Sequence, residues 1–199
     1  VRLRGLEDAP DAFWMTYAEE VGFDEQRWRE RLDSGATFIV VQEERDVGVV
    51  TGAEYEGRDG CAGLFGMWVA PEARGTGASL RLIGEVITWA RAEGYERLLL
   101  DVADENHAAI KLYERVGFLP TGRTAHMPAP RAHILEHERA LRVLHDVAHV
   151  SSPERSRSHF RSSSASVLIR ASVGCPRNPE RELCCCSAQG GWGWQHRHA

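Results

Sequence analysis

The sequence predicts an α/β (α+β) fold in which a central mixed β-sheet is flanked by helices. Short apolar runs separated by polar or glycine-containing turns occupy residues 37–69, a pattern typical of β-hairpins. From residue 77 onward, segments with helical spacing of apolar residues alternate with short apolar runs. Hairpins followed by strand–helix–strand–helix–strand indicate antiparallel and parallel pairing within one sheet. The chain of 199 residues is long enough for one such domain, with residues to spare.

The first predicted elements are helical and cover residues 7–33. The apolar residues at helical spacing are Phe13, Trp14, Tyr17 and Val21. Asp24 or Glu25 begins a second short helix, which carries Trp28. We expect Trp14 and Trp28 to be packing residues.

Three strands are predicted between residues 37 and 69. Residues 37–41 form a β-branched apolar run, and residues 47–53 and 62–69 form two more. Polar turns at residues 43–46 and 57–60 separate the runs, and Pro71 ends the third.

Two helices and three strands are predicted after the hairpins. Residues 77–94 place their apolar side chains on one helical face and stop at Gly94. Residues 98–102 are nearly all apolar, as expected of a strand covered on both faces. A helix begins at Glu105 or Asn106 and stops at Gly117, and residues 118–124 and 133–143 are the last predicted strands.

The composition changes near residue 147. Residues 151–166 are rich in serine and arginine, and only residues 167–169 suggest a regular element. We therefore divide the chain into a domain over residues 1–146 and a tail over residues 147–199 that we expect to be mostly disordered. The alternative interpretation of the tail is a segment translated out of frame or from a vector. The cysteines of the tail lack a Cys-x-x-Cys pair, so no metal site is expected there.

Charge is divided between these two parts. Residues 1–146 hold 17 Lys and Arg against 26 Asp and Glu, a net charge of −9, within a chain total of −5. An acidic domain argues against nucleic acid as the main partner and is compatible with a cationic substrate. We found no apolar run long enough to cross a bilayer and no signal-peptide pattern at residues 1–4, so we expect a cytoplasmic protein without a membrane partner.

The segment over residues 64–79 predicts an anion-binding site. It is an apolar strand that runs into a glycine-rich turn, with Gly75 and Gly77, at the start of a helix. Unpaired backbone amides and the helix dipole converge at such a terminus, which favours a phosphate-bearing ligand. A dinucleotide-binding domain is one alternative, because Asp101 ends a later strand. The third glycine position of that fingerprint falls on Leu80, which argues against it.

Two signatures in this region carry a resemblance to a known family. The first, Gln/Arg-x-x-Gly-x-Gly/Ala, falls on Arg74, Gly77 and Ser79, with serine in place of the usual Gly or Ala. The second is complete and consists of Asn106, Ala109, Tyr113, Gly117 and Phe118. With these motifs the chain resembles the GNAT family of acetyl-CoA-dependent N-acetyltransferases over roughly residues 1–143. The family's first strand would precede the first helix; this chain lacks it, so one sheet edge is expected to be weakened.

The resemblance implies a binding site for acetyl-CoA. The backbone amides of the turn would bind the pyrophosphate, beside the positive charge of Arg74. The residues that supply these amides are Gly75, Thr76, Gly77, Ala78 and Ser79. The backbone of Met67, Trp68 and Val69 would pair with pantetheine as an added strand does. In this family that strand is splayed from its neighbour at a bulge, where the acetyl group sits.

The resemblance also implies the chemistry. An amine attacks the thioester directly, and Tyr113 gives the leaving thiolate its proton as general acid. Asn106 would hydrogen-bond pantetheine or a water and hold the helix start. The base that deprotonates the amine is left open, with Glu54 as the working choice among five candidates, which are Glu19, Glu20, Glu54, Tyr55 and Glu56.

Other properties remain open at this point. The acceptor is any small-molecule or peptide amine, and a homodimer is one option for the assembly. A non-catalytic acyl-CoA-binding module of the same fold is the alternative function, since fold does not fix function.

Overall fold

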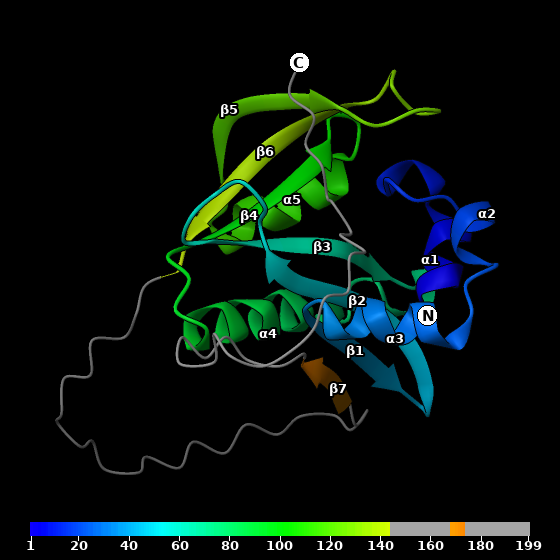
Figure 1. Ribbon diagram of the computed structural model, residues 1–199. Coiled ribbons are helices and arrows are strands. Elements are labelled where there is room, and N and C mark those ends of the chain that lie inside the picture. The colour runs from blue at the N-terminus through cyan, green and yellow to red at the C-terminus, as the bar shows by residue number, and fades with distance from the viewer. Residues whose placement is uncertain (144–167, 174–199) are drawn as a thin grey trace, which may run out of the picture.

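A computed structural model describes residues 1–143 and 168–173 (Figure 1). Within these residues one mixed sheet contains seven strands in the order β5-β6-β4-β3-β2-β1-β7. The strands are β1 Ala36–Gln42, β2 Arg45–Glu54, β3 Cys61–Val69, β4 Arg97–Ala103, β5 Leu119–His126, β6 Leu135–Arg142 and β7 Leu168–Val173. All neighbours pair antiparallel except β3 and β4, which are parallel. The predicted mixed sheet is confirmed.

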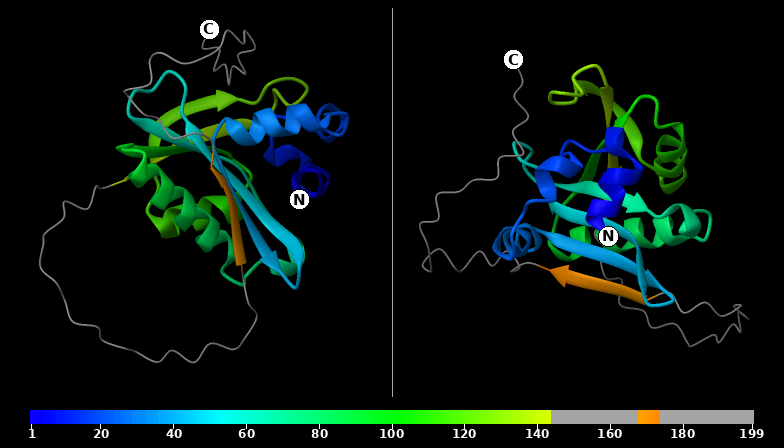
Figure 2. Two further views of the ribbon diagram at one scale, coloured as in Figure 1. Left: turned by 60° about the horizontal axis from the view of Figure 1, so that its bottom comes forward. Right: turned by 90° about the vertical axis from the view of Figure 1, so that its right-hand side faces the viewer.

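Helices cover both faces of the sheet (Figure 2). The helices are α1 Arg2–Asp8, α2 Tyr17–Glu20, α3 Glu25–Asp33, α4 Ala78–Ala92 and α5 His107–Val116, with short 3-10 turns η1 Pro10–Ala12 and η2 Pro71–Ala73. The N-terminal helices lie on one face, and α4 and α5 lie on the other. α4 buries Leu82, Ile83 and Val86 against the sheet, so the predicted apolar face is the one that packs.

The helical prediction for residues 7–23 is wrong in part. The chain there forms the end of α1, the short turn η1 at Pro10, an irregular stretch and the four-residue α2. Pro10 lacks an amide and restricts the residue before it, which ends α1. Thr16 and Glu19 then form a capping box that starts a new helix. The later boundary is as predicted, because Asp24 caps α3 with its side chain.

The outer edge of β1 is covered by β7. Leu168–Val173 pairs antiparallel with β1, and Ile169 packs against the main hydrophobic core. This edge of the sheet therefore receives a strand from the C-terminal part of the chain. The remaining residues of the predicted tail, including its cysteines, lie outside the described residues.

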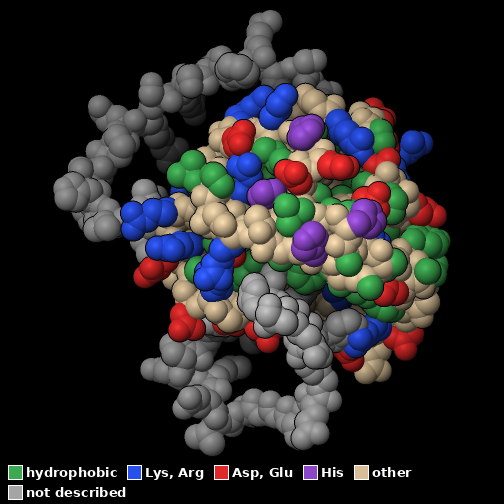
Figure 3. Space-filling view, turned by 90° about the horizontal axis from the view of Figure 1, so that it is seen from above, with side chains coloured by type: hydrophobic (Ala, Val, Ile, Leu, Met, Phe, Trp, Pro, Cys, Tyr) green, Lys and Arg blue, Asp and Glu red, His purple; other side chains and the backbone are tan. Residues whose placement is uncertain are grey.

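The surface on the side of β5 and β6 carries acidic, basic and histidine side chains interspersed with one another (Figure 3). None of the helices in the described ranges is both long and apolar enough to cross a membrane.

Candidate active site

An opening between β3 and β4 is the central feature of the candidate site. The two parallel strands pair only where Cys61–Gly63 meets Arg97–Leu99, and beyond this point no pairing joins them. On its other side β3 has a register shift against β2, between Val49 and Thr51. Gly66 lies at this irregularity with a φ of 59°, a conformation that favours glycine. The bulge and the opening thus occur together in the middle of the sheet.

The glycine turn lies between the end of β3 and the start of α4. Gly75 and Gly77 have φ values of 77° and 88°, and the space that a Cβ would occupy is empty at both. Gly77 is the N-cap of α4, and no side chain caps the helix there. The amides of Ala78 and Ser79 therefore start the helix without a capping side chain, as an anion site requires. The turn fits a phosphate-bearing group.

The Arg74 side chain connects this turn to the end of β3. Its Nε donates to the carbonyl oxygen of Val69 at 3.0 Å, and its Nη2 forms an ion pair with Asp8. Asp8 also accepts a 2.9 Å hydrogen bond from Trp68 Nε1. This hydrogen bond and the positive charge of Arg74 lower the pKa of the Asp8 carboxyl group. The Trp68 side chain is 5% exposed, so this residue can face a ligand mainly through its backbone.

Tyr113 reaches β3 from α5. Its hydroxyl lies 3.8 Å from the sulfur of Met67, the residue after Gly66, and its ring packs edge-on against Phe118. Burial raises the pKa of the Tyr113 phenol above its ordinary value, which already lies well above neutral pH, so the hydroxyl is protonated there. Asn106 caps α5 by accepting from the amide of Ala109 at 3.2 Å, which fixes the start of the helix that carries Tyr113.

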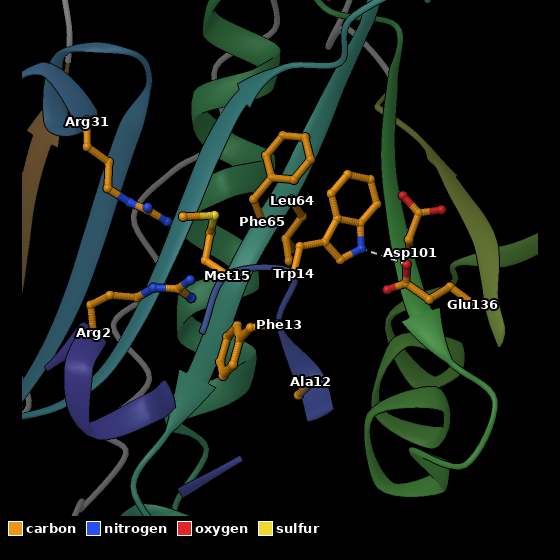
Figure 4. A pocket seen from close by; sticks show the side chains of 11 residues that line it. Arg2, Ala12, Phe13, Trp14, Met15, Arg31, Leu64, Phe65, Asp101 and Glu136 are labelled. Carbon is orange, nitrogen blue, oxygen red and sulfur yellow. Dashed lines mark hydrogen bonds between the residues drawn. The ribbon is translucent and has the colours of Figure 1, made fainter. Parts of the chain in front are cut away.

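A pocket opens beside Gly66 (Figure 4). Its volume is about 80 Å³, several times the roughly 10–15 Å³ that one water molecule needs. Segments far apart in the sequence contribute its walls, which consist of Arg2, Ala12, Phe13, Trp14, Met15, Arg31, Leu64, Phe65, Gly66, Asp101 and Glu136. Trp14 is therefore not only a packing residue, because it lines this pocket in the irregular stretch before α2.

Two carboxylates form one wall of the pocket. Glu136 is 4% exposed and accepts a 2.6 Å hydrogen bond from Trp14 Nε1. Burial raises the pKa of Glu136 to about 7; the nearby charge of Asp101 adds to this, and Trp14 and Arg131 oppose it. Asp101 accepts a 2.9 Å hydrogen bond from the Tyr55 hydroxyl. Neither carboxylate was predicted from the sequence as a residue of the active site. An acidic residue at a buried strand position is the signal that could have identified Glu136.

Two guanidinium groups form the opposite wall. The fully buried Glu20 accepts from Arg2 Nε at 3.0 Å and Nη2 at 2.8 Å, and from Arg31 Nη1 at 3.0 Å. Arg2 Nη1 is buried and has no hydrogen-bond partner among the described residues. It lies 3.3 Å from the position that a Cβ on Gly66 would take. One guanidinium nitrogen is thus directed at the bulge in β3.

The five residues considered as bases are absent from the lining of this pocket. Glu54 is exposed at the end of β2, opposite Ala62 rather than Gly66. Tyr55 donates to Asp101, and Glu20 holds the two arginines. Glu19 belongs to the capping box of α2, and Glu56 is exposed after β2.

The fold is a mixed sheet that opens between two parallel strands, and comparisons with known proteins identify the family to which it belongs. Residues 3–118 match the acetyltransferase (GNAT) family, and the chain belongs to this family. It is similar to the uncharacterized N-acetyltransferase YobR of Bacillus subtilis, with 31% identity over 57% of this chain and 48% of that protein. It is also similar to human N-acetyltransferase 8B, with 32% identity over 46% of this chain and 42% of that protein. The chain spans about half the length of the curated relatives it matches.

Solved structures share the fold. A putative GNAT acetyltransferase from Desulfovibrio desulfuricans has a TM-score of 0.56 at 19% identity, covering 72% of this chain and 91% of that one. The putative acetyltransferase yncA from Salmonella typhimurium, solved with its cofactor acetyl-CoA, has a TM-score of 0.54 at 15% identity, covering 76% and 90%.

Proposed function

We propose that the protein is an N-acetyltransferase that transfers the acetyl group of acetyl-CoA to a primary amine. The observation that carries this proposal is the opening between β3 and β4. A buried tyrosine hydroxyl reaches β3 beyond the paired part of the strands, a pocket with two carboxylates includes Gly66 of β3, and a glycine turn suited to phosphate follows the strand. Membership of the GNAT family supports the same activity.

Acetyl-CoA would be held along the end of β3 and the start of α4. The turn amides from Gly75 to Ser79 would bind the pyrophosphate, and Arg74 would keep the turn fixed to Val69 while adding positive charge. The backbone from Met67 to Val69 would pair with the pantetheine amides, with Asn106 at the start of α5 beside it. When bound, acetyl-CoA supplies the acetyl group as a thioester.

Tyr113 acts as the general acid in this proposal. Its phenol is protonated at neutral pH, burial raises its pKa further, and its hydroxyl is directed at Met67 next to the bulge. A proton donor at this place serves a sulfur leaving group formed at the opening.

Glu136 takes the role of general base in place of Glu54. Its carboxyl lines the pocket, and its pKa of about 7 suits a group that accepts a proton from an ammonium near neutral pH. Asp101, oriented by the Tyr55 hydroxyl, lines the same wall and adds negative charge beside it.

Calorimetry with acetyl-CoA on the full chain, with NADH as control, tests the ligand class first. We expect micromolar binding of acetyl-CoA and none of NADH. A folded protein that binds no acetyl-CoA would overturn the proposal.

A thiol-release assay with a panel of amines then tests turnover. Tyr113→Phe should lower kcat by roughly 10²–10⁴-fold, the usual contribution of proton transfer, and leave the affinity for acetyl-CoA unchanged. Binding of acetyl-CoA without release of thiol for any amine would instead favour the alternative, a non-catalytic acyl-CoA-binding module.

A further inference from the structure

We propose that the acceptor is a free α-amino acid with an apolar side chain, a class narrower than the amines of the proposed function on which this inference rests. The pocket presents opposite charges on two walls with apolar side chains between them (Figure 4). A zwitterion matches both walls at once, whereas a simple amine matches only one.

The cationic wall has unused capacity for a carboxylate. Two guanidinium groups share the single carboxylate of Glu20, so this wall keeps a net positive charge. Glu20 occupies Nε and Nη2 of Arg2, and Nη1 is left buried without a hydrogen-bond partner in the described part of the chain. An unsatisfied buried donor is costly, and a carboxylate is the acceptor that a guanidinium binds best. A ligand carboxylate at this nitrogen would satisfy it.

The anionic wall suits an ammonium group. Asp101 and Glu136 line it. The Tyr55 hydroxyl donates to Asp101, and Trp14 Nε1 donates to Glu136. Carboxylate oxygens have several acceptor sites, so Glu136 retains capacity for the donors of an ammonium, beside the negative charge of Asp101. Arg131, which lies near Glu136, offsets part of this negative charge. A polyamine would also meet the repulsion of Arg2 and Arg31.

The position of Gly66 indicates that the amine and carboxylate of the ligand are close together. Arg2 Nη1 lies 3.3 Å from the Cβ position of Gly66, so the carboxylate site is beside the bulge at which the amine must react. In an α-amino acid the two groups are attached to the same carbon, which keeps both near β3. Phe13, Met15 and Phe65 then offer apolar contacts to the side chain.

Ligand-observed NMR on the full chain, with and without free CoA, tests this directly. The probes are leucine, 3-methylbutan-1-amine, which lacks the carboxylate, and 4-methylpentanoic acid, which lacks the amine; phenylalanine and its two counterparts form a second set. We expect at least one of the two amino acids to bind tenfold or more tightly than both of its counterparts. Amine binding as tight as that of the amino acid, or no amino acid binding with or without CoA, would overturn the inference.

Arg2→Met, which keeps the length of the side chain, isolates the carboxylate site. It should weaken amino acid binding at least tenfold without weakening amine binding, and unchanged amino acid binding would contradict the proposal. Arg4→Met on the same helix is the matched control, because Arg4 pairs with Glu72 at the surface and does not line the pocket. A separate acetyl-CoA titration distinguishes the proposed acetyltransferase function from the proposed amino acid acceptor. If acetyl-CoA binds and the amines bind more tightly than the amino acids, only the proposed acceptor is wrong.

Discussion

At the scale of single residues, the proposed role of Glu136 as general base predicts how activity depends on pH. Its pKa is raised to about 7, first by burial and then by the charge of Asp101. Only the ionised carboxylate accepts a proton, so kcat/KM should rise as pH increases through about 7 and level off above it. Glu136→Gln keeps an acceptor for Trp14 but cannot be protonated, so this rise should disappear and activity should fall roughly 10²–10⁴-fold.

A pH series of thiol release on the wild type and two variants measures this. Glu138→Gln is the control on the same strand, because Glu138 is buried but binds Arg58 and Thr121 outside the pocket. The rise near pH 7 should survive in Glu138→Gln. If it also survives in Glu136→Gln, another group is the base.

Pairs of residues in the candidate site differ in whether a sequence can predict that they act together. Tyr113 and Asn106 lie seven positions apart on one helix, so a local motif identifies them together. Trp14 and Glu136 are separated by 122 positions, and only the folded sheet brings them into contact. The alignment of Arg2 with Gly66 depends in the same way on α1 packing over β3. Pairs that meet only through tertiary structure leave no spacing to detect.

At the scale of elements, the two ends of α4 allow a matched experiment on the glycine turn. Gly77 before the helix and Gly94 after it have φ values of 88° and 82°, with no atom near a Cβ position at either. Alanine at each site should therefore cost a similar free energy of unfolding, about 1 kcal/mol. Only Gly77→Ala places a methyl group at the turn proposed to bind pyrophosphate.

Acetyl-CoA titrations and denaturant unfolding on both variants separate these effects. We expect Gly77→Ala to weaken acetyl-CoA binding about tenfold or more, while Gly94→Ala keeps wild-type affinity with the same loss of stability. Equal affinities in the two variants would remove the turn from the binding site.

Elements were predicted best where one physical signal dominates. Residues 98–102 form a nearly continuous apolar run, and they became the central part of β4. Residues 7–23 carry competing signals, since apolar spacing favours a helix while Pro10 and the Thr16 cap interrupt it. The backbone preferences of Pro10 and Thr16 determine the structure of this segment. Phe13 and Trp14 therefore lie outside a helix and line the pocket.

At the scale of the whole molecule, β7 links the C-terminal part of the chain to the stability of the sheet. It covers the outer edge of β1, which would otherwise present unpaired backbone groups. Ile169 packs against the main core, opposite Val40, whereas its neighbour Arg170 is exposed. β1 and β2 lie between β7 and the opening beside β3, so β7 should support the fold without touching the site.

Ile169→Ala should lower the free energy of unfolding by about 1–3 kcal/mol. This loss is smaller than the roughly 2–5 kcal/mol typical of a fully buried isoleucine, because Ile169 is only partly buried. Arg170→Ala on the same strand should change it by less than about 0.5 kcal/mol, as surface substitutions usually do. Urea unfolding of the full chain measures both, and acetyl-CoA affinity should stay at the wild-type value in each. Equal stabilities for the two variants would mean that β7 does not pack on β1 in solution, whereas loss of affinity in Ile169→Ala would show that the edge strand and the site are coupled through β1 and β2.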